Sequence, residues 1–203
     1  MFFLTLKDKS NSYLSDPDVC LMLEFQEGNK ASFETLMHKY FPRLLNFIYR
    51  YVSSREAAQD LTQEVFIRVY KSGSGYKPQS KFQTWVFTIA RNLSLNELRR
   101  NKHRTVSLDA TFSSDDGEMR RQVEDPNSVS PDEDLLRREK AVAVKAAIDD
   151  LPENQRVAVL LRRYEQFSYE EIARTMNISP KAVKSLLSRA RESLKTKLAH
   201  LLP

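Results

Sequence analysis

The chain has 203 residues, enough for one large or two small domains, and its net charge of +5 at pH 7 favours an acidic partner such as nucleic acid. One cysteine rules out an internal disulfide, and three widely separated histidines without cysteine companions give no metal-site pattern. No apolar run is long enough to span a membrane, so we expect a cytoplasmic protein with no membrane insertion.

The spacing of apolar residues indicates the fold class. Apolar residues recur three and four apart nearly throughout, and only 4 Gly and 8 Pro interrupt them. This period is typical of amphipathic helices, and no convincing alternating strand pattern is present. We therefore predict an all-α fold of two small helical domains joined by a flexible acidic linker, the second domain containing a helix-turn-helix.

The charge is divided sharply along the chain. Residues 1–104 hold 16 Lys and Arg against 10 Asp and Glu, and residues 137–203 hold 14 against 8. Residues 105–136 between them hold 2 against 9. Two basic parts suit a polyanion, whereas the acidic connector would be repelled by one unless something holds it in place.

The first part of the chain begins with two predicted helices. Asp16 and Pro17 are a favourable N-cap and first helical residue for a short helix. Gly28 and Asn29 separate it from a longer helix at about 30–52. The many large apolar residues of this longer helix predict a central position in the core.

Two further helices complete the first unit. Ser53 with Glu56 forms the pattern of a capping box for a helix that ends near Lys71. Ser80 with Gln83 forms the same pattern for a helix that runs toward Arg104. Residues 16–104 are therefore expected to form a compact four-helix unit.

The third helix of this unit has two different faces. One face is apolar and is expected to be buried; it comprises Ala58, Leu61, Val65 and Val69. The opposite face comprises Asp60, Gln63, Glu64 and Ile67. Acidic and amide groups beside an exposed isoleucine suit a protein partner that offers cations around an apolar contact. The alternative is an ordinary solvated helix face.

The fourth helix carries a tryptophan at the edge of its apolar stripe. Beside Trp85 lie polar and basic residues, namely Thr88, Asn92, Asn96 and Arg99. Such a ring can receive an unstacked base, although a single tryptophan is more often a core residue. The basic end of the helix, including Arg99 and Arg100, is suited to phosphate contact.

The connector lacks helical periodicity. From residue 105 to residue 130, Ser, Asp, Gly and Pro accumulate, which is typical of a flexible tether. A second unit follows from residue 131, with a first helix to about Asp149 and another that ends near Tyr164.

Residues 168–194 have the pattern of a helix-turn-helix. Ser168 with Glu171 caps a first helix, and Ser179 with Pro180 begins a second. One face of the second helix is apolar, and the other comprises Lys181, Lys184, Ser185, Ser188 and Arg189. Cations and short hydroxyls suit a DNA major groove, and a solvated face of a bundle helix is the alternative.

These motifs together resemble a known family. Residues 60–66 (DLTQEVF), 82–92 (FQTWVFTIARN), 151–156 (LPENQR) and 169–173 (YEEIA) stand in the order found in bacterial sigma factors of the extracytoplasmic-function type, or ECF type. The resemblance covers nearly the whole chain after about Asp16. It implies a group 4 sigma factor, the minimal kind that keeps only the second and fourth conserved sigma domains.

The resemblance implies a division into parts. Residues 16–104 would be the region 2 domain, which binds core polymerase and recognises and melts the minus-ten element. Residues 131–203 would be the region 4 domain, which recognises the minus-thirty-five element. The acidic linker, residues 105–130, would thread the basic active cleft of the polymerase, or act only as a spacer, and residues 1–15 would be an N-terminal extension.

The resemblance also assigns site residues. The residues that would dock on the clamp helices of the largest polymerase subunit are Asp60, Gln63, Glu64 and Ile67. The residues for the minus-ten element are Trp85, Thr88, Asn92, Asn96, Arg99 and Arg100. Around Asn92 to Asn96 the family has a loop that captures a flipped base, so a break in the fourth helix is expected there. The residues that would read the minus-thirty-five element are Lys181, Lys184, Ser185, Ser188 and Arg189.

Further partners follow from the same resemblance. They are the polymerase flap for the second domain, promoter DNA as duplex and as single strand, and an inhibitory anti-sigma factor. No cofactor, metal or small-molecule substrate is implied, and the chain would not be an enzyme, because catalysis belongs to the polymerase. The alternative is a stand-alone helix-turn-helix regulator that binds duplex DNA without polymerase.

Overall fold

The computed structural model describes residues 13–105 and 131–201, and within these ranges its secondary structure is entirely helical. The expected acidic linker from residue 106 onward, and residues 1–12 of the expected extension, lie outside the described residues. The elements are α2 (Pro17–Gln26), α3 (Lys30–Val52), α4 (Arg55–Lys71), η1 (Gly73–Gly75), α5 (Phe82–Thr105), α6 (Pro131–Asp149), α7 (Glu153–Arg163), α8 (Tyr169–Met176), α9 (Pro180–Lys197) and η2 (Ala199–Leu201).

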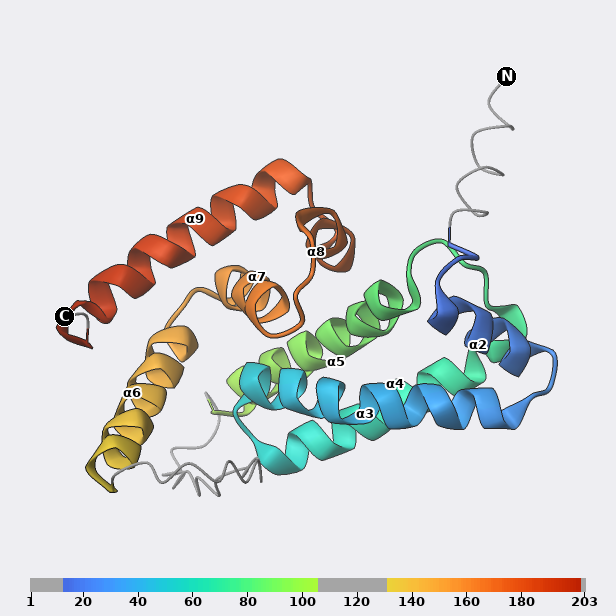
Figure 1. Cartoon of the computed structure of the whole chain (residues 1–203), viewed down its shortest axis with the longest axis horizontal. Helices are drawn as coiled ribbons and strands as arrows, with labels where there is room; N and C mark the ends of the chain where they lie inside the picture. Colours follow the sequence, from blue (N-terminus) through green and yellow to red (C-terminus); the bar gives the residue numbers. More distant parts are fainter. Residues whose placement is uncertain (1–12, 106–130, 202–203) are drawn as a thin grey trace.

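The first unit, α2 to α5, is built around α3. This helix packs against α2, α4 and α5, which confirms its predicted central position (Figure 1). Its large side chains Tyr40, Leu44 and Phe47 are fully or almost fully buried. Burial of aromatic and aliphatic groups of this size is the main source of stability for the unit.

Two of the predicted helix caps are wrong. Ser53 is the left-handed residue that ends α3, with φ of 57°, and the next residue, Ser54, caps α4 by accepting a hydrogen bond from the Ala57 amide. At α5, the Phe82 amide donates to a carboxylate oxygen of Asp16, 66 positions earlier, at 3.2 Å. The Ser80 hydroxyl instead donates to the Lys81 carbonyl. In both cases a helix begins near the predicted position. The capping group is a different residue, the adjacent Ser54 for α4 and the distant Asp16 for α5.

The second unit, α6 to α9, contains the predicted helix-turn-helix. Helix α7 packs against α8 and α9, and the buried residues between them include Val157, Leu161, Ile172 and Val183. Helix α6 lies at one side of the unit and touches α9 (Figure 1). The predicted starts of these four helices agree with the structure to within one or two residues, and α9 ends three residues beyond Leu194, where the predicted pattern stops.

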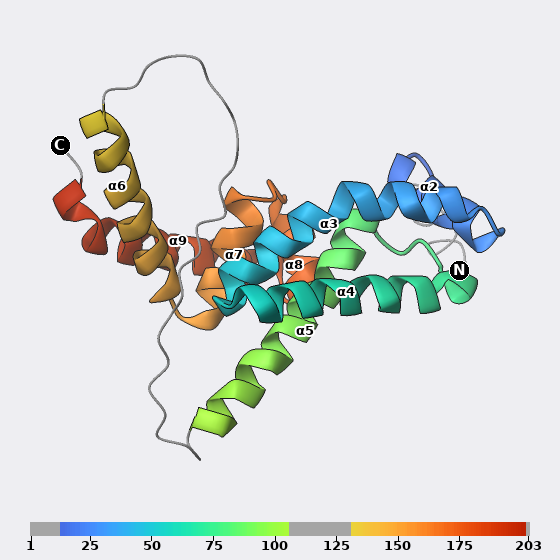
Figure 2. The ribbon, with the colours of Figure 1, turned by 90° about the horizontal axis from the view of Figure 1, so that it is seen from below.

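The two units pack directly against each other. Helix α5 contacts α8, and α3 contacts α7, so the second unit lies against the first rather than apart from it (Figure 2). Buried residues of both units belong to one continuous hydrophobic cluster. In the part of the chain that the structure describes, no helix combines the length and apolarity that crossing a membrane would require.

Candidate nucleic-acid and protein interfaces

The helix-turn-helix is fixed by three local backbone features. The Ser168 hydroxyl accepts from the Glu171 amide at 3.2 Å, and the Glu171 carboxylate accepts from the Ser168 amide at 2.8 Å, so the predicted capping box is confirmed. Asn177 turns the chain in the left-handed conformation, with φ of 54°. Ser179 then caps α9 by accepting from the Ala182 amide at 3.2 Å.

The outer face of α9 is open to solvent. Only Val183 and Ala190 of this helix are buried, and both lie on the side that faces α7 and α8. The predicted DNA-reading residues are all exposed: Lys181, Lys184, Ser185, Ser188 and Arg189. The structure therefore brings together a cationic, hydroxyl-bearing surface of the kind that enters a major groove.

The outer face of α4 is also exposed, and one of its carboxylates already forms an ion pair within the helix. Asp60, Gln63 and Ile67 are exposed and Glu64 is half-buried, with Ile67 at 45% exposure. The Glu64 carboxylate accepts from the Arg68 guanidinium at 2.8 Å, one helical turn away. A cationic partner would therefore compete with an exposed ion pair, which is a weak competitor.

Beside this face lies an apolar hollow that sequence reasoning missed. It has a volume of about 410 Å³, and its lining includes Phe33, Met37, Phe41, Phe66 and Tyr70. The first three lie on α3 at intervals of four residues, so they share one side of that helix. That spacing was visible in the sequence, but only the packing of α3 on α4 places it next to Gln63 and Ile67.

Trp85 is half-buried between two other rings. Its ring centroid lies 5.0 Å from that of Tyr76 and 5.7 Å from that of Phe82. Trp85 borders two hollows. One, of about 310 Å³, includes Tyr76, Lys77 and Gln79, and the other, of about 340 Å³, includes Lys71 and Asn92. One part of the ring is thus in the core and another part is available to a ligand, while its role toward a base stays a prediction.

The expected loop at Asn92 to Asn96 is absent from the described structure, because α5 is continuous from Phe82 to Thr105. Ser94 and Leu95 are buried there, and the Ser94 hydroxyl donates to the Ala90 carbonyl at 2.8 Å. Burial of this turn against the core keeps it helical. The residues expected to contact the minus-ten element are spread along the helix: Thr88 is half-buried, and Asn92, Asn96, Arg99 and Arg100 are exposed.

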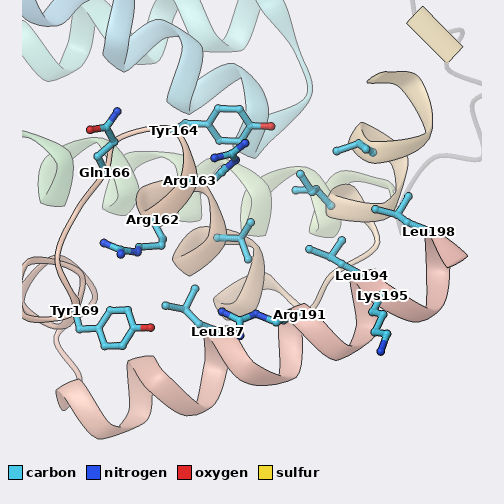
Figure 3. A pocket seen from close by; sticks show the side chains of 13 residues that line it. Arg162, Arg163, Tyr164, Gln166, Tyr169, Leu187, Arg191, Leu194, Lys195 and Leu198 are labelled. Atoms are coloured by element: carbon cyan, nitrogen blue, oxygen red, sulfur yellow. The ribbon is translucent and has the colours of Figure 1, made fainter. Parts of the chain in front are cut away.

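A second site missed by sequence reasoning is a groove between α6, α7 and α9 (Figure 3). Its volume is about 940 Å³, and apolar residues such as Leu187, Leu194 and Leu198 line it together with cations. The cations of this groove are Arg162, Arg163, Arg191 and Lys195. An apolar lining with cations around it suits an amphipathic segment that carries acidic residues.

Burial also sets the protonation of groups near these surfaces. Burial raises the pKa of the Tyr76 hydroxyl beside Trp85, and the Asp16 carboxylate adds to the effect, so this ring is neutral at pH 7. For Glu171, burial alone would raise the pKa, but hydrogen bonds from Lys81 and Ser168 together lower it. The capping carboxylate is therefore ionised at pH 7.

Comparison with known proteins gives matches over both units. Residues 36–104 match the family description Sigma-70 region 2, and residues 141–194 match Sigma-70, region 4. The chain is 35% identical to the RNA polymerase sigma-H factor of Pseudomonas aeruginosa, over 92% of this chain and 96% of that protein. It is 32% identical to the ECF RNA polymerase sigma-E factor of Haemophilus influenzae, over 91% of this chain and 97% of that protein.

Two solved structures share the fold. CnrH in complex with the cytosolic domain of CnrY gives a TM-score of 0.66 at 20% identity, covering 90% of this chain and 97% of that one. The sigma factor RpoE of Bartonella quintana, in complex with the anti-sigma factor NepR, gives 0.65 at 24% identity, covering 82% and 96%. At these identities the likeness concerns the fold alone.

Proposed function

The chain belongs to the RNA polymerase sigma factors of the ECF type, and from this premise we propose how its surfaces divide the work of transcription initiation. The chain is of the group 4 kind, with residues 16–104 as the region 2 domain and residues 131–203 as the region 4 domain. Residues 105–130 connect the two, and residues 1–15 are an extension. It acts in the cytoplasm and leaves catalysis to the polymerase.

Helix α9 reads the minus-thirty-five element. Its exposed face carries the reading residues Lys181, Lys184, Ser185, Ser188 and Arg189, and none of them is needed for the core of the unit. Lysine and arginine donate to guanine edges and to phosphates, and the short serine side chains permit a close approach. The two caps of the helix-turn-helix hold α9 rigidly, which is what base-edge contacts require.

Helix α5 binds the minus-ten element at its Trp85 end. Extruding a base costs a few kcal/mol, so a receiving pocket with aromatic support is needed. The hollow between Tyr76 and Trp85 supplies both, and it replaces the loop expected at Asn92 to Asn96 as the site for the flipped base. The exposed residues farther along α5, Asn92, Asn96, Arg99 and Arg100, contact the backbone of the strand.

Helix α4 and the groove of the second unit bind core polymerase. The face formed by Asp60, Gln63, Glu64 and Ile67 docks on the clamp helices, and the hollow beside Gln63 and Ile67 takes an apolar side chain of the partner. The groove between α6, α7 and α9 takes the flap. An anti-sigma factor, the remaining proposed partner, would inhibit by covering these same surfaces.

The observation that carries the proposal is the combination of an exposed cationic helix in one unit with an acidic docking face in the other. Run-off transcription with purified core polymerase tests it. Gln63→Ala with Glu64→Ala should lose core binding. Lys184→Ala with Arg189→Ala should keep core binding and lose upstream promoter contact.

Matched controls separate these effects from a general loss of charge. Glu34→Ala removes one carboxylate from the exposed surface of α3, and Lys30→Ala with Arg55→Ala removes two exposed cations. Both should transcribe as the unaltered chain does. If Gln63→Ala with Glu64→Ala left core binding unchanged, the docking assignment would be wrong.

A further inference from the structure

The segment between α4 and α5 supplies most of the hollow beside Trp85, and helix α2 supports this segment from behind. Residues 72–81 contain η1 and line the hollow with side chains that include Tyr76, Lys77 and Gln79. Helix α2 contacts both η1 and α5 (Figure 1). The shape of the hollow therefore depends on a helix that is not part of its lining.

The Asp16 carboxylate joins the starts of two helices. Its Oδ1 accepts from the Asp18 amide at 3.0 Å in the first turn of α2, and its Oδ2 accepts from the Phe82 amide at 3.2 Å at the first residue of α5. The first amides of a helix have no partner within the helix, so they need an acceptor of this kind. A carboxylate has two acceptor oxygens, whereas the side chain of asparagine has one. A single residue before α2 thus also fixes where α5 begins.

Asp16 is held in place by a buried polar contact of its neighbour Asp18. Asp18 is 7% exposed, and its carboxylate accepts from the Lys39 ammonium at 2.6 Å and from the Tyr40 hydroxyl at 2.6 Å. Both donors lie on α3, the central helix of the unit. Hydrogen bonds to a charged group are among the strong ones, so they anchor the start of α2 to the core. Asp16, two residues earlier, is anchored with it.

The position of Phe82 determines that of Trp85. The ring of Phe82 is fully buried, and its centroid lies 5.1 Å from that of Tyr40 and 5.7 Å from that of Trp85. Trp85 follows Phe82 by three residues on α5, so the two side chains lie on the same side of the helix. Burial raises the pKa of the Tyr76 hydroxyl, and the nearby Asp16 carboxylate adds to the effect. Both rings of the hollow are therefore close to the contacts of Asp16.

Two further contacts fix η1 to the other end of α2. The Gln26 side-chain amide donates to the Ser74 carbonyl at 3.0 Å. Gly73 is buried against Phe25, and a Cβ at this position would lie 2.5 Å from the Cε1 atom of that ring. Only glycine permits this approach of backbone to ring. The segment is thus fixed at both ends, by the start of α2 at α5 and by the end of α2 at η1.

We propose that Asp16 is a positioning residue that holds the hollow between Tyr76 and Trp85 in the shape that receives an extruded base. This inference rests on the proposed function, because it requires a base to occupy that hollow. A pocket that is ordered in only a fraction of the molecules binds more weakly in proportion to that fraction. Asp16 does not touch the DNA and acts through Phe82 on Trp85.

The fluorescence of Trp85 tests the positioning without DNA or polymerase, because Trp85 is the single tryptophan of the chain. Asp16→Asn keeps one acceptor, and asparagine caps a helix as well as aspartate does, so the Asp18 amide should stay paired. The Phe82 amide should lose its acceptor, because the asparagine oxygen is already in use. In the free full chain, this variant should increase the quenching of Trp85 by acrylamide while the midpoint of thermal unfolding changes little.

The matched control removes a cap elsewhere in the same unit. Ser54→Ala takes away the hydroxyl that accepts from the Ala57 amide at 3.3 Å at the start of α4. This variant should lower the midpoint of thermal unfolding more than Asp16→Asn does, because its helix is left without its cap. It should leave the quenching of Trp85 unchanged.

Strand binding by the holoenzyme gives the second readout. The probes are single-stranded oligonucleotides from a promoter that the holoenzyme transcribes, with an abasic site at each position of the minus-ten element in turn. At one position the unaltered holoenzyme should prefer the intact strand roughly 5- to 150-fold, and Trp85→Ala should lose most of this preference. Asp16→Asn should lower the preference roughly 5-fold, as for the loss of one cap. Gln26→Glu, which cannot donate to Ser74, should lower it roughly 2-fold, and Ser54→Ala should keep it.

The proposal requires Asp16→Asn to change both the quenching and the base preference. It is overturned if either one stays as in the unaltered chain, or if Ser54→Ala changes both as much as Asp16→Asn does. If the unaltered holoenzyme showed no base preference at any position, the proposed function of the hollow would be wrong. The quenching would then still show whether Asp16 fixes Trp85.

Discussion

Helices α5 and α9 are the two that we assign to DNA, and they relate to the core in opposite ways. Helix α5 packs against α2, α3, α4 and α8, and Phe82, Val86 and Phe87 on it are fully buried. Helix α9 buries only Val183 and Ala190 and leaves a continuous face in solvent. Substitutions on the exposed face of α9 should therefore change DNA binding alone, whereas those at the buried positions of α5 that support Trp85 should change folding and DNA binding together.

The difference matches the two tasks. Reading a duplex from its groove requires a helix that protrudes from its domain, so few of its residues can be buried. Holding a DNA strand open requires aromatic side chains whose positions are fixed, and packing against the core is what fixes them. Trp85, wedged between Tyr76 and Phe82, shows this arrangement.

The two helices should differ most in how much a substitution on each lowers the free energy of unfolding. Phe87→Ala removes a fully buried ring that packs on Phe47 and Phe167 and should cost about 3–5 kcal/mol of unfolding free energy. Ser188→Ala on the exposed face of α9 should change it by less than about 0.5 kcal/mol. Urea denaturation followed by circular dichroism measures both. Equal losses of unfolding free energy would show that the exposed face of α9 contributes to stability as much as the buried face of α5 does.

A smaller effect concerns the edge of α5. Trp85→Ala removes a stacking surface and should weaken binding of single-stranded promoter DNA by the holoenzyme by about 1–3 kcal/mol. Trp85→Phe keeps an aromatic face and should retain most of the affinity. Fluorescence anisotropy with a labelled single-stranded oligonucleotide measures the difference. If the alanine variant bound the strand normally, Trp85 would be only a core residue.

The cap of α9 tests whether this helix depends on local rather than tertiary contacts. Ser179→Ala removes the acceptor for the Ala182 amide and should destabilise the second unit by about 1 kcal/mol. Ser179→Asp keeps an acceptor and should lose much less. Thermal unfolding followed by circular dichroism provides the measurement. A loss as large as that of Phe87→Ala would mean that α9 is tied to the core more closely than its burial suggests.

The smallest effect on stability is expected on the reading face. Lys184→Ala should change the free energy of unfolding by less than about 0.5 kcal/mol. It should also lower the magnitude of the slope of log affinity against log salt concentration by about 1, which corresponds to the loss of one phosphate contact. Binding of duplex promoter DNA by the holoenzyme at several salt concentrations measures it. Lys30→Ala, an exposed cation on α3, should leave the slope unchanged. If the slope were unchanged for Lys184→Ala, Lys184 would not contact a phosphate.

Local sequence patterns were enough to predict the helix-turn-helix. The two helix starts depend on hydrogen bonds and backbone geometry within three residues, at Ser168 with Glu171 and at Ser179 with Pro180. Because these interactions are local, they could be recognised without knowing the rest of the fold. The apolar spacing of α9 likewise identified its free face. The helical class and nearly all helix bounds followed from patterns of the same short range.

Contacts between groups far apart in the sequence could not be predicted from local patterns. The cap of α5 comes from Asp16, the hollow beside α4 comes from one side of α3, and Arg43 finds Glu165 across 122 positions. The expected break near Asn92 did not occur because packing buries Ser94 and Leu95. The physical reason is range: local hydrogen bonds and periodicity are encoded over a few residues, whereas burial and ion pairing depend on which surfaces the folded chain brings together.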